Sequence, residues 1–156
     1  DLYDTSNSNT DTLGERQVTD SVVRGGRVIF TTTIPDNSTC GATDTGWLME
    51  LSAYSGARLD EAPFDANGDG LINSADLIAY AADGTSLNQA IVASGKKSTV
   101  GLLPTPGILS DYSNMTNPKE YKYMSGSSGQ IEVVTENAEA GDQTFFGRSS
   151  WIQLFK

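Results

Sequence analysis

The sequence contains no histidine and only one cysteine, Cys40, among its 156 residues. The absence of histidine excludes imidazole acid–base chemistry, the Ser-His-Asp triad and the commonest zinc ligand. With one cysteine, no disulfide can form within the chain, so Cys40 is a free thiol or pairs with a cysteine elsewhere in a longer protein. Nothing in the sequence places two carboxylates together as a glycosidase pair. We therefore expect no enzymatic activity.

The chain also lacks long apolar runs and an excess of positive charge. No apolar stretch approaches the roughly 20 residues that span a membrane, so membrane insertion is not expected. The net charge of −10 and the pI of about 4.2 disfavour nucleic acid and anionic lipid as partners, and suit a cation site. The chain begins with Asp1 rather than Met, which indicates a processed chain or part of a longer one.

Glycine, serine, threonine, asparagine and aspartate are abundant, and long helix-forming stretches are missing. This composition predicts a loop-rich, all-β, antiparallel fold. We expect an irregular arm over residues 1–12 and one domain over residues 13–156. Gly25-Gly26 predicts a hairpin between residues 22–23 and 27–33. A second hairpin is predicted for residues 47–53 and 57–60, and further strands for residues 90–93, 99–103, 107–110, 120–125, 130–136 and 150–155.

The strands form a rough internal repeat over residues 19–59 and 105–137. Each copy contains three or four short strands joined by hairpins, which is the unit of a β-propeller blade. Two units are too few to close a propeller. The chain is therefore expected to be a segment of a larger propeller, or to have its sheet edges covered by partners. Trp47 and Trp151 are expected to pack between sheets, because their large rings favour burial. The turn at residues 125–129 is read as a hairpin rather than a phosphate-binding loop, because it lacks the lysine such loops carry.

The most informative stretch is residues 65–76, DANGDGLINSAD. Oxygen donors stand at loop positions one, three, five, seven, nine and twelve, in the ligand order of an EF-hand calcium loop. Glycine stands at position six, where such a loop turns sharply. Aspartate replaces the usual bidentate glutamate at position twelve, so we expect modest affinity, with a Kd on the order of 10⁻⁴ to 10⁻³ M. The alternative is a polar turn without metal. The expected Ca²⁺ ligands are Asp65, Asn67, Asp69, the carbonyl of Leu71, Asn73 and Asp76, with a short helix over residues 76–82.

Several segments together resemble the C-terminal region of the PilY/PilC family of type IV pilus proteins. They are residues 14–20 (GERQVTD), 27–32 (RVIFTT), 46–51 (GWLMEL), 55–59 (SGARL), 64–70, 121–129 (YKYMSGSSG) and 147–154 (GRSSWIQL). The resemblance implies a quinoprotein-like β-propeller with a calcium loop, in a secreted protein at the pilus tip. It also implies export through the periplasm, an extracellular or cell-surface location, and a role in pilus assembly and surface adhesion. Calcium occupancy would bias the pilus toward extension.

The partners implied by the resemblance are pilin or minor pilin subunits, the rest of a longer parent chain, and a host or abiotic surface. Two other interpretations stay open. The chain could be a calcium-stapled structural scaffold in a surface filament. It could also be a docking module, because residues 65–78 are similar to a dockerin repeat; dockerins carry two such repeats, and one is found here.

Overall fold

The computed structural model describes residues 14–35, 44–80 and 89–141. The expected arm over residues 1–12, Cys40, Trp151 and the predicted strand over residues 150–155 lie outside the described residues. Within the described ranges, all extended segments pair antiparallel, which confirms the predicted all-β class. No helix in this part of the chain is long and apolar enough to cross a membrane.

The first sheet has four strands in the order β1-β2-β3-β6. The predicted hairpin at Gly25-Gly26 is confirmed. Both glycines have positive φ, 56° and 74°, which a two-residue hairpin turn requires and which only glycine adopts without strain. The last strand arrives from a distant part of the sequence and pairs with the free edge of β3. The strands are β1 (Val22–Arg24), β2 (Arg27–Ile34), β3 (Thr45–Ser52) and β6 (Gly95–Lys97).

The second sheet has three strands in the order β7-β8-β9. Its strands are β7 (Gly107–Asp111), β8 (Lys119–Ser125) and β9 (Ile131–Asn137), close to the predicted ranges. The segment after β8 forms the predicted hairpin turn, in which the Gly126 N–H donates to the Gln130 carbonyl at 2.7 Å. The phosphate-loop alternative is therefore excluded at this turn, because strands flank it on both sides.

The predicted helix over residues 76–82 is wrong. A single 3₁₀ turn, η1 (Ser74–Asp76), ends at Leu77, and β4 (Ile78–Tyr80) follows, paired with β5 (Gln89–Ile91). The short apolar segment gains no helical face to bury, and short helices are unstable without one. Ile78 instead pairs with Ile91 across the ribbon, as β-branched residues favour.

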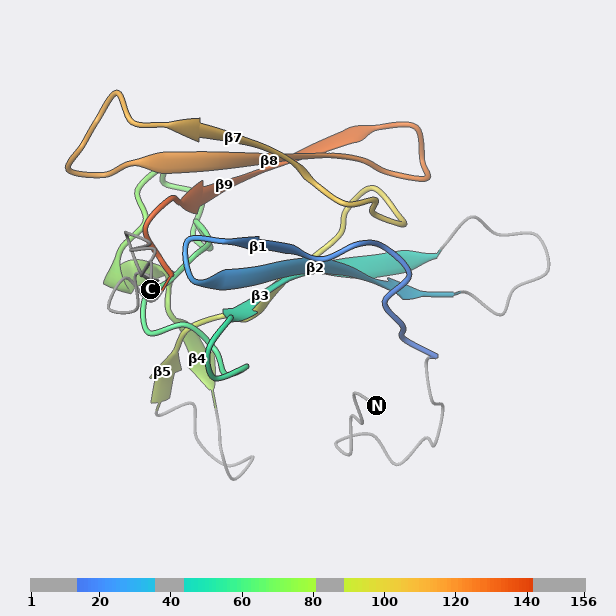
Figure 1. Cartoon of the computed structure of the whole chain (residues 1–156), viewed down its shortest axis with the longest axis horizontal. Coiled ribbons are helices and arrows are strands. Elements are labelled where there is room, and N and C mark those ends of the chain that lie inside the picture. The colour runs from blue at the N-terminus through green and yellow to red at the C-terminus, as the bar shows by residue number, and fades with distance from the viewer. Residues whose placement is uncertain (1–13, 36–43, 81–88, 142–156) are drawn as a thin grey trace, which may run out of the picture.

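The two larger sheets lie face to face, with the β4–β5 ribbon at one side (Figure 1). Their inner faces share one hydrophobic core: Ile29 and Leu48 come from the first sheet, and Met124 and Val134 from the second. Phe64, Val100 and Leu103 complete the core from the connecting segments. Two facing sheets match the predicted repeat of strand units, and the described residues form no closed ring of sheets.

Three further predictions are wrong. Residues 57–60 leave the sheet after the turn that ends β3, and Leu59 packs instead in a small second cluster with Val92 and Ala140. Residues 99–103 are a bend rather than a strand, because Gly101 takes a φ of 91°. Trp47 is only half-buried: Leu48 faces the core, so the alternation of side chains along a strand turns Trp47 to the opposite face.

Candidate metal-binding loop and buried ion cluster

The candidate loop, residues 65–76, is attached to the second sheet at two points. At its start, Phe64 forms a β-bridge with Glu136, and the Asn137 N–H donates to the Pro63 carbonyl at 2.9 Å. In its middle, the Lys119 ammonium donates to the Gly70 carbonyl at 2.6 Å. The loop is therefore held between the last residues of β9 and the first residue of β8.

Asp65, at position one, organises the first half of the loop. Its Oδ1 accepts the Gly68 N–H at 2.7 Å and its Oδ2 accepts the Gly70 N–H at 2.9 Å. Both glycines have positive φ, 76° and 79°, so the backbone can wrap around this carboxylate. The glycine expected at position six therefore makes the sharp turn predicted from the sequence.

The next two predicted ligands, Asn67 and Asp69, also accept backbone N–H groups of the loop through their side-chain oxygens. Asn67 Oδ1 accepts the Asp69 N–H at 2.9 Å, and Asp69 Oδ1 accepts the Leu71 N–H at 2.7 Å. These contacts between a side chain and a backbone N–H two residues ahead are Asx turns, which asparagine and aspartate favour. They orient successive side-chain oxygens along one winding of the loop.

Asp76, at position twelve, closes the loop. Its side chain is buried, its Oδ1 accepts the N–H groups of Ala66 and Asn67, and its Oδ2 accepts the Asn73 N–H at 2.8 Å. Asn73 in turn accepts the Ala75 N–H at 2.8 Å, which completes a capping box on η1. The side chain of Asp76, at the end of the loop, therefore contacts the backbone at the start of the loop.

The donor set fits a hard cation, because all six predicted ligands are oxygens, as calcium prefers. A carboxylate offers about four lone-pair sites, so those of Asp65, Asp69 and Asp76 keep acceptor capacity beyond their backbone partners. The three carboxylates do not converge: within the described ranges, no three acidic or cysteine side chains gather at metal-binding distance. The residues thus fit calcium in donor type and order, and the structure does not bring their carboxylates together.

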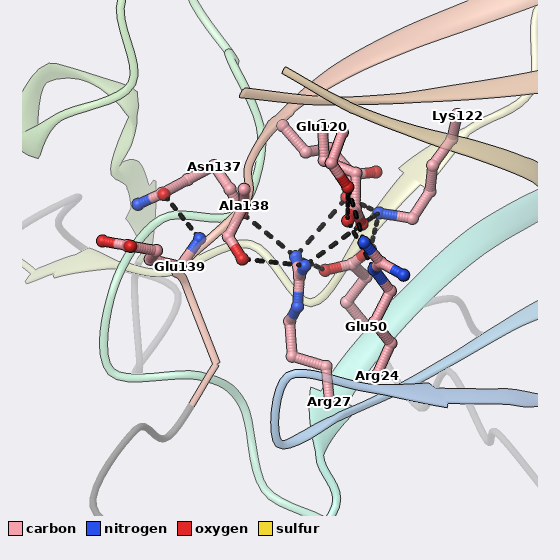
Figure 2. A network of polar contacts seen from close by, with 10 residues as sticks. Arg24, Arg27, Glu50, Glu120, Lys122, Asn137, Ala138 and Glu139 are labelled. Carbon is pink, nitrogen blue, oxygen red and sulfur yellow. Dashed lines mark hydrogen bonds and ion pairs between the residues drawn. The ribbon is translucent and has the colours of Figure 1, made fainter. Parts of the chain in front are cut away.

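A second polar feature, absent from the sequence-based predictions, lies between the two sheets (Figure 2). We call it the buried ion cluster; it consists of Arg27, Glu50, Glu120, Lys122 and Glu136, with half-exposed Arg24 at its rim. The Arg27 guanidinium is 2.9 Å from Glu50 Oε2 and 3.1 Å from Glu120 Oε1. Arg24 Nε is 2.8 Å from Glu120 Oε2. Arginines from the first sheet thereby reach glutamates of both sheets.

Lys122 stands at the centre of this cluster. Its Nζ is 2.5 Å from Glu50 Oε1, 3.3 Å from Glu120 Oε1 and in contact with Glu136 Oε2. Burial lowers the pKa of the Lys122 ammonium below its ordinary value of 10.5, and the adjacent Glu50 carboxylate partly offsets this effect. Among the described residues, Glu136 Oε1 and Arg27 Nε have no hydrogen-bond partner. The cluster is therefore charge-balanced with Arg24, but incompletely hydrogen-bonded.

The sequence did carry a sign of this cluster. In strands, side chains two residues apart share a face. Glu120 and Lys122 alternate in step with buried Met124, and Glu136 alternates in step with buried Val134. Charged residues in register with core residues thus indicate that the charges themselves point inward.

These features define an antiparallel all-β domain with two larger facing sheets, which carries an acidic loop with oxygen donors in EF-hand order. Over 55 residues, the chain is 40% identical to a protein named type IV pilus biogenesis factor PilY1 homolog, from Xylella fastidiosa (strain Temecula1). This confirms the resemblance to type IV pilus biogenesis proteins in that segment. The match covers 35% of this chain and 4% of the relative. No family model matches the chain, and no solved structure matches it.

Proposed function

We propose that this chain is a calcium-binding, propeller-derived domain of a type IV pilus-associated surface protein. It supports pilus assembly and surface adhesion and catalyses no reaction. Two observations support the proposal: the partial match to a pilus biogenesis factor, and an acidic loop with oxygen donors in EF-hand order. Its location is extracellular, and its partners are pilin or minor pilin subunits, the rest of a longer parent chain, and a host or abiotic surface.

In this proposal, the function depends on calcium binding by the loop of residues 65–76. Asp65, Asn67, Asp69, Asn73 and Asp76 hold Ca²⁺ through side-chain oxygens, and Leu71 through its carbonyl. The ion supplies the positive charge that allows three carboxylates to come together without repelling one another. Because the loop is bonded to β8 through Lys119 and to β9 through Phe64, a fixed loop also fixes one end of the second sheet. Calcium thereby stabilises one conformation of the domain.

Calorimetric titration of the chain with Ca²⁺ tests this proposal. One site with a Kd on the order of 10⁻⁴ to 10⁻³ M is expected. Asp65→Ala should abolish the binding heat, whereas Asp60→Ala removes an equal charge just outside the loop and should retain it. Normal calcium binding by Asp65→Ala would refute the ligand assignment. Two sites per chain would instead favour the dockerin-like alternative.

A second candidate function is a calcium-stapled scaffold within a surface filament. The attachment of the loop to two strands of one sheet favours this scaffold function. A loop attached in this way holds the two strands together even if the domain has no recognition surface. Sedimentation with and without pilin subunits separates the two functions. A stable complex with pilin subunits supports the tip role, and calcium-dependent self-association into filaments supports the scaffold.

A further inference from the structure

The buried ion cluster places a lysine amine against carboxylates in a site closed to solvent. The side chains of Lys122, Glu50 and Glu136 have no exposed surface. Lys122 Nζ contacts Glu136 Oε2 and lies 2.5 Å from Glu50 Oε1. These buried atoms therefore have only one another and the other side chains of the cluster as possible reaction partners.

We propose that Lys122 and Glu136 condense within the folded protein to form an intramolecular amide bond between Lys122 Nζ and Glu136 Cδ. The inference does not depend on the calcium loop or on the pilus assignment. It concerns residues that the proposed function leaves without a role.

Glu136 is the acceptor because its carboxylate is the least stabilised of the three. Glu120 is held by Arg24 at 2.8 Å, by Arg27 at 3.1 Å and by the Ser110 hydroxyl at 3.2 Å. Glu50 keeps one oxygen bonded to Arg27 at 2.9 Å. Glu136 Oε1 has no hydrogen-bond donor within the described structure, and its Oε2 lies against the lysine amine.

The step balances without any outside reagent. Lys122 transfers one proton to Glu136, which gives a neutral amine and a carboxylic acid. The amine lone pair then attacks Glu136 Cδ, and Glu50 Oε1 accepts a proton from Nζ. Glu50 returns this proton to the departing hydroxyl, which leaves as water. An ammonium and a carboxylate thus become one amide and one water molecule, and Glu50 is regenerated. Arg27 Nη1 lies 3.7 Å from Glu136 Oε2, and its positive charge stabilises the negative charge that develops on this carboxyl group in the intermediate.

The surroundings favour this reaction over a permanent ion pair. Burying separate charges is costly, and the neutral amine–acid pair avoids that cost. The lowered pKa of Lys122 acts in the same direction, because the neutral amine is the nucleophile. After condensation, Arg24 and Arg27 still face Glu50 and Glu120, so the remaining cluster stays balanced. The bond would tie β8 to β9 across their hairpin.

Intact mass under denaturing conditions tests the proposal on the unaltered chain, so no variant needs to fold. The expected mass is lower than the sequence mass by one water molecule. Lys122→Arg keeps the positive charge but cannot form the amide, and should show its full sequence mass. Glu136→Gln should lose ammonia instead of water, and so reach the same final mass as the unaltered chain. Glu50→Gln should slow or prevent the reaction. A full sequence mass for the unaltered, folded chain overturns the proposal.

Cleavage after methionine locates the bond. Met49, Met115 and Met124 divide the chain, so the proposed bond joins fragment 116–124 to fragment 125–156. Attachment of fragment 116–124 to fragment 50–115 would make Glu50 the acceptor and overturn the assignment. A water loss confined to fragment 50–115, as from a succinimide at Asp69-Gly70, or to fragment 116–124 alone, would also overturn it.

Discussion

Asp65→Ala is the most direct test of whether the acidic loop binds calcium. The substitution removes the ligand at position one together with the acceptor of the Gly68 and Gly70 N–H groups. It leaves both sheets and their shared core untouched, because Asp65 is no part of that core. The variant should therefore fold, be less stable than the parent chain without calcium, and gain nothing when calcium is added.

The expected size of the calcium effect follows from mass action. With a Kd of about 10⁻⁴ M, Ca²⁺ at about 10 mM is about 100 times the Kd and stabilises the folded chain by about 2.7 kcal/mol. For a chain of this size, each kcal/mol raises the melting temperature by about 2–4 °C, so the total shift is about 5–11 °C. Without calcium, loss of the two N–H contacts to a half-buried carboxylate should cost about 1–3 kcal/mol.

Thermal unfolding in the presence of a chelator measures the cost of the substitution without calcium. Repeating it with excess Ca²⁺ measures the stabilisation by calcium. Asp60→Ala is the matched control, since it removes the same charge from an exposed position just before the loop. The parent chain and Asp60→Ala should show equal calcium shifts. An undiminished shift in Asp65→Ala would refute the reasoning, because the stabilisation would then come from calcium bound elsewhere.

Three further predictions concern the fold. Arg27→Met removes one of the two buried cations that Glu50 and Glu120 share, and should cost about 3–5 kcal/mol in urea unfolding. Arg58→Ala at the surface should change stability by less than about 0.5 kcal/mol, and equal effects of the two substitutions would contradict the cluster. Leu48→Ala opens a cavity in the shared core and should cost about 2–5 kcal/mol by the same measurement; a neutral result would mean that the sheets do not pack there. Hydrogen bonds from Ser113 hold the pKa of Asp111 below 3.8, so its contribution to stability is complete above that pH and is lost as the pH falls through the folded pKa. An NMR titration should show the Asp111 pKa rising toward its ordinary value in Ser113→Ala.

The parts of the fold predicted correctly are those fixed by local chemistry. Gly25-Gly26 specifies its hairpin because the turn needs two residues with positive φ. The strands β8 and β9 follow from alternation and β-forming residues. Gly70 likewise makes the sharp turn expected at loop position six, with a φ of 79°.

The parts that were missed depend on contacts distant in sequence. Residues 76–82 contain no local feature that excludes a helix, and pairing with strand β5 decides the conformation of Ile78–Tyr80. Trp47 was assigned to the core by its size alone, but the register of Leu48 with the core turns it to the other face. Alternation along β8 points Glu120 inward, but its arginine partners lie on the other sheet, 93 and 96 residues away in the sequence, and no single-strand pattern predicts that pairing.

The same strands serve both the loop and the cluster. Lys119 and Glu120 are neighbours on β8: the first bonds to the loop carbonyl of Gly70, and the second points inward to Arg27. On β9, Glu136 takes part in the cluster through its side chain and pairs with Phe64, just before the loop, through its backbone. A disturbance of the cluster that shifts these strand ends must therefore move both attachment points of the loop. If the loop binds calcium as proposed, Arg27→Met should weaken that binding although Arg27 contacts no ligand, whereas Leu48→Ala, which leaves the charged network intact, should weaken it less.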